Sequence, residues 1–267
     1  MNPPSTLLLD NGSLEPAATL RLRELAAALG ARLGAPVAPV SLLHSSAITP
    51  DRLHGMAAEI LEPALARRAG QGETEFVVVP LFFGPSRALT SYLPERLGHL
   101  RRKHPRLRVR LADPLFAPAD DRLARILVDH VRATGGTSRV VVVDHGSPAR
   151  EVTAVRDALA AQVSARLGAG VTVAAASMER RPEPEYDFCA PRLADLLGQP
   201  GWDRGEVALA MQFLLPGRHA GPDGDVAKIC HAAEAAHPGL RTRLTRLVGE
   251  HPLLLEILAD RWRAAAA

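Results

Sequence analysis

The chain has 267 residues, of which 47% are hydrophobic, and its 32 Lys and Arg against 29 Asp and Glu give a formal net charge of +3. This length and composition suffice for two domains of ordinary size, each with its own core. No apolar run approaches the length that spans a bilayer and the N-terminus lacks the basic and apolar regions of a signal peptide, so we expect a cytoplasmic protein that does not bind membranes.

The first half of the chain alternates between short apolar segments and segments with helical periodicity. The apolar segments predict parallel strands that are covered on both faces, at Leu7 to Leu9, Val37 to Leu43, Phe76 to Phe82 and Leu107 to Leu111. The spacing of apolar residues predicts helices over Thr19 to Leu33 and over Asp51 to Arg68. This alternation indicates an α/β fold in which an open parallel sheet is flanked by helices.

The second half repeats the landmarks of the first half. An apolar run followed by Asp-X-Gly-Ser occurs at Leu7–Ser13, where X is Asn11, and at Val140–Ser147, where X is His145. Three further pairs follow in the same order: Ala38–Ser45 with Thr172–Glu179, Val77–Arg87 with Ala208–Arg218, and Arg110–Leu115 with Arg246–Leu253. Four ordered matches predict a duplication.

We therefore expect two tandem domains, residues 1–134 and 135–267, related by a pseudo-two-fold axis. The composition of Thr134-Gly135-Gly136-Thr137-Ser138 is typical of a linker, which places the boundary there. A duplicated chain can supply both lobes itself, so we expect a monomer.

Three chemically capable residues of the second half follow three successive predicted strands. His145 follows the first strand, Glu179 the second and His219 the third. Because ligands of open α/β sheets bind at the carboxyl ends of the strands, these side chains should converge. Two imidazoles and a carboxylate suit a divalent first-row metal and leave coordination positions open.

The first half lacks these candidate ligands. Its corresponding positions, by the matches above, are Asn11, Ser45 and either Arg87 or Ala88, and none of them is a strong metal ligand. The Gly-Ser turn and the apolar strands were retained while the ligands are missing. We interpret residues 1–134 as a degenerate copy and expect a single site in residues 135–267.

Other function classes find less support in the sequence. The two cysteines, Cys189 and Cys230, are not in a Cys-x-x-Cys arrangement, so we expect neither a disulfide framework nor an iron–sulfur cluster. The basic run Arg101–His104 lacks interleaved aromatic residues, so we expect no nucleic-acid partner. No Gly-x-Gly-x-x-Gly follows either first strand, which argues against a dinucleotide-binding protein.

The motifs as a set resemble those of a known family. Val143–Ser147, Ser177-Met178-Glu179 and Gln212–Pro222, together with Pro80–Arg87 and Val248–Leu253, are similar to the sirohydrochlorin chelatases of the CbiX/SirB type, in their long, duplicated form. The resemblance spans essentially the whole chain. It implies two tandem chelatase-like domains and a lyase that inserts cobalt or ferrous iron into sirohydrochlorin, in cobalamin or siroheme biosynthesis.

The resemblance also implies site residues. The family's metal-binding and catalytic positions fall on His145, Glu179 and His219. The family usually has an Asp-Ile-Pro sequence four residues after its second His, whereas this chain has a glycine-containing insertion, so either Asp223 or Asp225 could supply that Asp.

The tetrapyrrole substrate carries peripheral carboxylates, and Arg guanidinium groups bind carboxylates well. The candidates beside the proposed site are Arg218, Arg180, Arg181 and Arg150.

The sequence leaves several alternatives open. Cobalt, ferrous iron and nickel all suit two imidazoles and a carboxylate, and neither the pathway nor the role of the first half is determined. A non-catalytic carrier of a tetrapyrrole or a metal is the alternative function. The intact trio of His145, Glu179 and His219 argues against the carrier.

Overall fold

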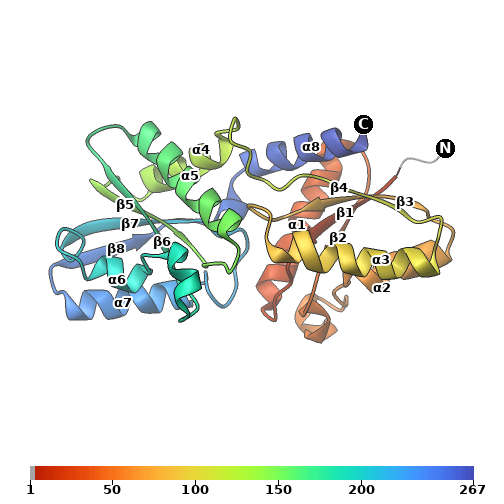
Figure 1. Ribbon diagram of the computed structural model, residues 1–267, viewed down its shortest axis with the longest axis horizontal. Helices are drawn as coiled ribbons and strands as arrows, with labels where there is room; N and C mark the ends of the chain where they lie inside the picture. Colours follow the sequence, from red (N-terminus) through yellow and green to blue (C-terminus); the bar gives the residue numbers. More distant parts are fainter. Residues whose placement is uncertain (1–3) are drawn as a thin grey trace. The chain divides into compact units, whose positions relative to one another are not determined.

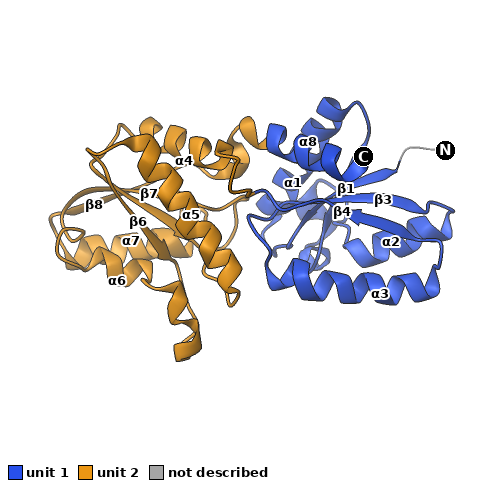
Figure 2. Cartoon of the chain, turned by 45° about the horizontal axis from the view of Figure 1, so that its top comes forward, with its two compact units in different colours: residues 1–115, 255–267 blue, residues 116–254 orange. Residues whose placement is uncertain are grey.

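The computed structural model describes residues 4–267 and divides into two compact units (Figures 1 and 2). Unit 1 contains the chain up to Leu115 together with Leu255–Ala267, and unit 2 contains Phe116–Leu254. Each unit is built around one parallel sheet of four strands. The predicted α/β class and the two flanked parallel sheets are confirmed.

The sheet of unit 1 has the order β2-β1-β3-β4. Its strands are β1 (Ser5–Asp10), β2 (Val37–Ser41), β3 (Glu75–Pro80) and β4 (Arg108–Leu111). Leu8 in β1 and Val78 in β3 are fully buried, since helices cover both faces of the sheet. This explains why the two central strands read as unbroken apolar runs.

Helices α1 (Pro16–Leu33) and α8 (Leu253–Ala266) cover one face of this sheet, and α2 (Leu61–Gly70) and α3 (Leu93–Lys103) cover the other (Figure 1). Alternate residues of β1 serve the two faces. Leu7 and Leu9 belong to the core under α2 and α3, whereas the hydroxyl of Thr6 accepts a 2.8 Å hydrogen bond from Nε1 of Trp262 in α8.

The predicted helix over Asp51 to Arg68 is wrong in its first half. A short 3-10 turn, Pro50–Leu53, ends at His54 and Gly55, which both have positive φ, and α2 begins only at Leu61. The segment between this turn and α2 does not form helical hydrogen bonds with itself. The carbonyl of Glu59 instead accepts a hydrogen bond from the amide of Ser41 at the end of β2.

The sheet of unit 2 has the order β6-β5-β7-β8. Its strands are β5 (Arg139–Asp144), β6 (Thr172–Ser177), β7 (Gly205–Met211) and β8 (Leu240–Leu244). Helices α4 (Arg122–Ala133) and α5 (Arg150–Leu167) cover one face, and α6 (Leu193–Leu197) and α7 (Asp225–Ala236) cover the other. The remaining short helical turns are η1 (Ser45–Ala47), η3 (Ala88–Tyr92), η4 (Pro184–Cys189) and η5 (Val248–Glu250).

The compact units differ from the sequence repeats in their last helices. Helix α4 ends the first sequence repeat but packs within unit 2, against α5 and β7, and α8 ends the second repeat but packs within unit 1 (Figure 2). The amphipathic face of α4 explains this, because residues such as Ile126 and Leu127 are fully buried in unit 2. The boundary at residue 134 therefore separates sequence repeats, whereas the compact units exchange their terminal helices.

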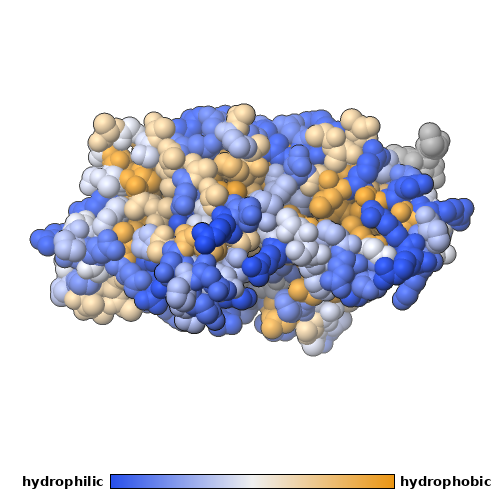
Figure 3. All heavy atoms as spheres, viewed as in Figure 1, coloured by the Kyte–Doolittle hydropathy of each residue, from blue (hydrophilic) through white to orange (hydrophobic). Residues whose placement is uncertain are grey.

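One face of the molecule is mainly hydrophilic, and neither cysteine is in a disulfide. On the face seen in Figure 3, hydrophilic residues predominate and hydrophobic residues form smaller groups between them. Within residues 4–267, none of the helices is both long enough and apolar enough to cross a bilayer. Cys189 and Cys230 are both free and buried.

Candidate metal centre

Three loops at the carboxyl edge of the unit 2 sheet carry the candidate residues. Strand β5 lies between β6 and β7, so the segments that follow these three strands are neighbours in space. The chain continues from β5 to its neighbour β6 and then crosses back to β7 on the other side. In sheets of this topology the divergence of the loops at that point opens a space for a ligand.

The turn that carries His145 depends on Gly146. Gly146 has φ of +93°, and a Cβ atom there would overlap the carbonyl oxygen of Glu179. The amide of Gly146 donates to the Asp144 carboxylate at 3.1 Å, and the amide of Glu179 donates to the His145 carbonyl at 3.2 Å. Only glycine allows this approach without strain. Thus the Gly-Ser signature of the sequence has a direct role in bringing His145 and Glu179 together.

The three predicted side chains lie together. Nε2 of His145 is 3.4 Å from Oε1 of Glu179, and the rings of His145 and His219 meet edge to face with their centroids 4.6 Å apart. The side chains of His145 and Glu179 are 46% and 61% exposed, and that of His219 is 32% exposed. The cluster is accessible to a small ion or molecule from outside.

Both imidazoles have their Nδ1 atoms engaged. Nδ1 of His145 lies 2.9 Å from the carbonyl oxygen of Gly146, and Nδ1 of His219 lies 2.7 Å from Oδ2 of Asp225. Each acceptor favours the tautomer in which Nδ1 carries the proton, and then the lone pair is on Nε2. The arrangement therefore presents two Nε2 lone pairs, which can bind a metal ion or accept a proton.

The structure distinguishes the two aspartates that the sequence left open. Asp225 contacts His219, whereas Asp223 is exposed. Asp225 begins α7, and Gly224 before it has no room for a Cβ atom beside the backbone of His219. The hydrogen bond from His219 holds the pKa of the Asp225 carboxyl below its usual value, with a smaller contribution from the charge of Lys228.

Asp144 belongs to the Asp-His-Gly-Ser motif, but no role for it was predicted from the sequence. It is buried, and its Oδ1 accepts hydrogen bonds from the Ser177 hydroxyl at 2.7 Å and from the amide of Gly146. Burial raises the pKa of Asp144, and the Ser177 hydrogen bond opposes this rise. The recurrence of the same Asp at Asp10 is the signal in the sequence that could have indicated a structural function.

The four candidate arginines differ in how they are engaged. Arg180 forms an ion pair with Asp187, Arg181 donates to the hydroxyl of Tyr186 at 3.3 Å, and the guanidinium of Arg150 lies 4.4 Å from the centroid of the Phe188 ring. These three arginines thus surround η4. Arg218 is 77% exposed and lies 3.5 Å from Asp225.

A pocket of about 300 Å³ opens beside His145. It is lined by His145, Gly146, Ser147, Pro148, Glu179, Arg180, Arg181, Tyr186 and Cys189. The lining combines two of the candidate ligands with two of the candidate arginines. Arg150 and Arg218 are not among the lining residues.

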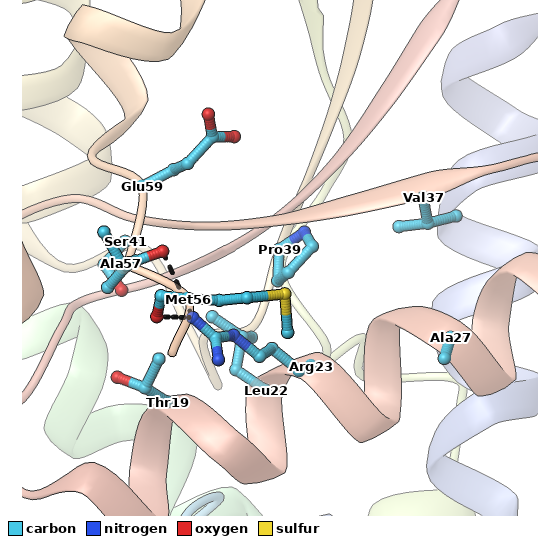
Figure 4. A pocket seen from close by; sticks show the side chains of 11 residues that line it. Thr19, Leu22, Arg23, Ala27, Val37, Pro39, Ser41, Met56, Ala57 and Glu59 are labelled. Atoms are coloured by element: carbon cyan, nitrogen blue, oxygen red, sulfur yellow. Dashed lines mark hydrogen bonds between the residues drawn. The ribbon is translucent and has the colours of Figure 1, made fainter. Parts of the chain in front are cut away.

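Unit 1 also has a pocket, of about 360 Å³, between α1 and β2 (Figure 4). No imidazole lines it, and the carboxylate of Glu59 is paired with Arg67 and Arg68. Arg23 donates to the carbonyl oxygens of Met56 and Ala57, as the dashed lines in Figure 4 show. This pocket is larger, but its lining offers no comparable set of ligands.

The hydrogen bonds and the strand register correct two predicted correspondences between the repeats. Glu179 donates its amide to His145, and in unit 1 the amide of Leu43 donates in the same way to Asn11. The counterpart of Glu179 is therefore Leu43 and not Ser45. The connection from β5 to β6 is two residues longer than the connection from β1 to β2. The constant spacing of 134 residues that was used to align the repeats did not account for this difference. The register likewise places Leu111 opposite Val78 and Leu244 opposite Leu209, so the predicted pairing of Arg110–Leu115 with Arg246–Leu253 is shifted by three residues.

The side chains are close but do not form a coordination shell as they stand. Within residues 4–267, no three His, Cys, Asp or Glu side chains have a geometry that would hold a metal ion. Glu179 lies near Nε2 of His145 and the two rings meet edge to face, so binding an ion requires these partly exposed side chains to turn.

The chain is similar to CbiX and SirB proteins in sequence pattern and in fold. The model of the CbiX family matches residues 5–134 and 139–265. SirB from Bacillus subtilis with Fe3+ superposes with a TM-score of 0.73 at 17% identity, covering 100% of this chain and 96% of that chain. SirB from Bacillus subtilis subspecies spizizenii in complex with cobalt superposes with a TM-score of 0.72 at 17% identity, covering 99% of this chain and 96% of that chain.

A third structure, of CbiX described as the terminal enzyme for biosynthesis of siroheme in denitrifying bacteria, gives a TM-score of 0.62 at 20% identity and covers 98% of this chain and 99% of that chain. At these identities the three structures establish the fold. No curated protein is similar enough in sequence to count as a relative.

Proposed function

Because the chain belongs to the CbiX family, we propose that it inserts a divalent metal ion into sirohydrochlorin at the carboxyl edge of the unit 2 sheet. The observation that carries this proposal is the proximity of His145, Glu179 and His219, which come from three different loops. The matching positions Asn11 and Leu43 in unit 1 cannot do the same chemistry. The chain would then have one working site.

In the proposed reaction the metal ion and the tetrapyrrole are both substrates. The ion replaces two protons on pyrrole nitrogens, so each turnover releases two protons and oxidises nothing. The Nε2 atoms of His145 and His219 hold the incoming ion as it loses water, and after its transfer to the ring they are free to accept protons. Imidazole suits both tasks because its pKa lies near neutral pH.

Glu179 and Asp225 have supporting roles in this mechanism. Glu179 is 61% exposed and can turn to become the third ligand or to relay a proton from the ring to solvent. Asp225 accepts the Nδ1 proton of His219, which orients the ring and keeps its Nε2 lone pair free for the ion.

The substrates are proposed at the level that the side chains support. Cobalt or ferrous iron is the proposed ion, since two imidazoles and a carboxylate bind both, and nickel remains chemically compatible. The cobalt ion would serve cobalamin synthesis and the iron siroheme synthesis. Arg218, Arg180 and Arg150 are proposed to contact the carboxylates of the tetrapyrrole. The side chain of Arg218 is 77% exposed and open to a ligand, whereas Arg180 would have to leave Asp187.

The test is an absorbance assay of metal insertion with sirohydrochlorin and Co2+, Fe2+ or Ni2+ in turn. The parent protein should insert at least one ion faster than the uncatalysed reaction, and His145→Ala and His219→Ala should each lose most of this rate. Asn11→Ala, at the matching position of unit 1, is the control and should keep the parent rate. Equal rates for all four proteins would remove the mechanism. Binding of sirohydrochlorin with insertion at the uncatalysed rate would instead favour a carrier.

A further inference from the structure

Unit 2 buries a charged side chain directly behind the candidate metal centre. Arg156, in α5, is 2% exposed and is among the largest fully buried side chains of the described chain. Arginine is almost never fully buried unless its guanidinium group has partners. A guanidinium group at this position therefore needs a specific explanation.

The guanidinium of Arg156 is tied to the strand ends that carry the candidate ligands. Its Nη1 donates to the hydroxyl of Ser177 at 2.7 Å, and this hydroxyl in turn donates to Oδ1 of Asp144 at 2.7 Å. The same Oδ1 accepts the amide of Gly146 in the turn after His145. Asp144 ends β5, which His145 follows, and Ser177 ends β6 two residues before Glu179.

Arg156 also holds one wall of the pocket. Its Nη1 donates to the carbonyl of Cys189 at 2.9 Å, and Nη2 donates to the carbonyl of Ala190 at 3.4 Å. Cys189 ends η4 and lines the pocket beside His145. The carboxylate of Asp157 accepts directly from Nε at 2.9 Å and from Nη2 at 2.7 Å. One buried cation thus joins β6 to η4 and, through the Ser177 hydroxyl, to the end of β5.

Unit 1 has no cation at the position that matches Arg156. The helices α1 and α5 both have 18 residues, and the seventh residue is Leu22 in α1 and Arg156 in α5. Asp10 and Ser41 pair in the register as Asp144 and Ser177 do. Oδ1 of Asp10 is nevertheless buried without a hydrogen-bond partner. The aspartate at the strand end is thus present in both units, as Asp10 and Asp144. The arginine is present only in unit 2, which also carries the two imidazoles.

We propose that Arg156 is a positioning residue of the metal centre, which acts through Ser177 and Asp144 to fix the turn that carries His145 and, through Cys189 and Ala190, the adjoining pocket wall. This inference rests on the proposed function of the site but concerns a residue that touches neither substrate. Outer residues that orient metal-binding side chains typically contribute 10- to 100-fold to metal affinity, and we expect a loss of about that size on removal of Arg156.

The experiment titrates Co2+ into the purified full-length protein and records the visible absorbance of the bound ion and its affinity, alongside insertion into sirohydrochlorin. Arg156→Leu, which copies the residue of unit 1, should bind Co2+ more weakly by about 10- to 100-fold and change the spectrum of the bound ion. Arg156→Lys keeps the charge without the planar fork and should recover part of the affinity. Ser177→Ala removes the link to Asp144 and decides the question if Arg156→Leu fails to fold.

Leu159→Ala is the matched control, since Leu159 is buried in the same helix and has no bond to the network. It should lower thermal stability while leaving Co2+ affinity and spectrum unchanged. Parent-like Co2+ affinity and insertion in Arg156→Leu, or in Ser177→Ala, would overturn the proposal, as would losses equal to those of Leu159→Ala. If the parent binds Co2+ but does not insert it, the proposed function fails, and a response of the Co2+ spectrum to Arg156→Leu would still support positioning.

Discussion

The imidazole rings of His145 and His219 meet edge to face with their centroids 4.6 Å apart, although they belong to loops that follow different strands. This contact exists because β5 and β7 are neighbours in the sheet and the loops leave at its carboxyl edge. The neighbouring carboxylate of Glu179 comes from the loop on the other side of β5.

Asp225→Asn should weaken Co2+ binding about 10- to 100-fold, since the Asn amide no longer supplies a negative charge to the His219 ring. Isothermal titration with Co2+ measures the effect. Asp223→Asn is the matched control, because Asp223 is exposed and only two residues away, and it should bind Co2+ as the parent does. If the two variants behave alike, Asp225 has no orienting role.

Gly146→Ala should disrupt the metal centre, because the added Cβ would overlap the carbonyl of Glu179 and the positive φ is unfavourable for alanine. Gly12→Ala makes the same change in unit 1, where the Cβ would overlap the carbonyl of Leu43. Both variants should lose stability in thermal unfolding. Only Gly146→Ala should lose Co2+ affinity, and a comparable loss in Gly12→Ala would show that the effect is not local.

Asp10→Asn should stabilise the protein near pH 7. Burial raises the pKa of Asp10 from 3.8 to about 6, which the hydrogen bond from Ser41 opposes. The folded state therefore binds the proton more tightly than the unfolded state, and stability falls as the pH rises from about 4 to about 6. Removing the charge should recover up to about 3 kcal/mol at pH 7 and almost nothing at pH 4.

Urea unfolding of the parent and of Asp10→Asn at pH 4 and pH 7 measures this difference. Asp51→Asn, at an exposed position of the same unit, is the control and should change stability little at either pH. A variant that is less stable than the parent at pH 7 would show that the Asp10 carboxylate is satisfied in the folded state.

Arg218→Ala should raise KM for sirohydrochlorin with little change in kcat, since the proposed role of this exposed side chain is to bind a carboxylate of the substrate. Steady-state insertion kinetics separate the two constants. Arg192→Ala is the control, because Arg192 is half-exposed and paired with Asp195 in unit 2. A fall in kcat at unchanged KM would place Arg218 in the chemical step instead.

Much of this site could be predicted from the order of residues along the chain. Strand ends of a parallel sheet share one edge, so His145, Glu179 and His219 could be placed together once the strands were recognised. Their roles as ligands remain a proposal. The choice between Asp223 and Asp225 could not be made, because it depends on the course of the glycine-containing loop before α7.

The α/β class, the duplication and the edge of the sheet where the candidate residues gather could be read from the amino-acid sequence. Apolar periodicity and the succession of strands and helices along the chain are visible in the sequence. The folded arrangement was needed to show that Leu43 is the counterpart of Glu179, that Arg156 is linked to Asp144 through Ser177, and that α4 and α8 each pack in the unit of the other repeat. These relationships join residues far apart in sequence, and they depend on loop lengths and on which surfaces are buried together, neither of which has a periodic signal.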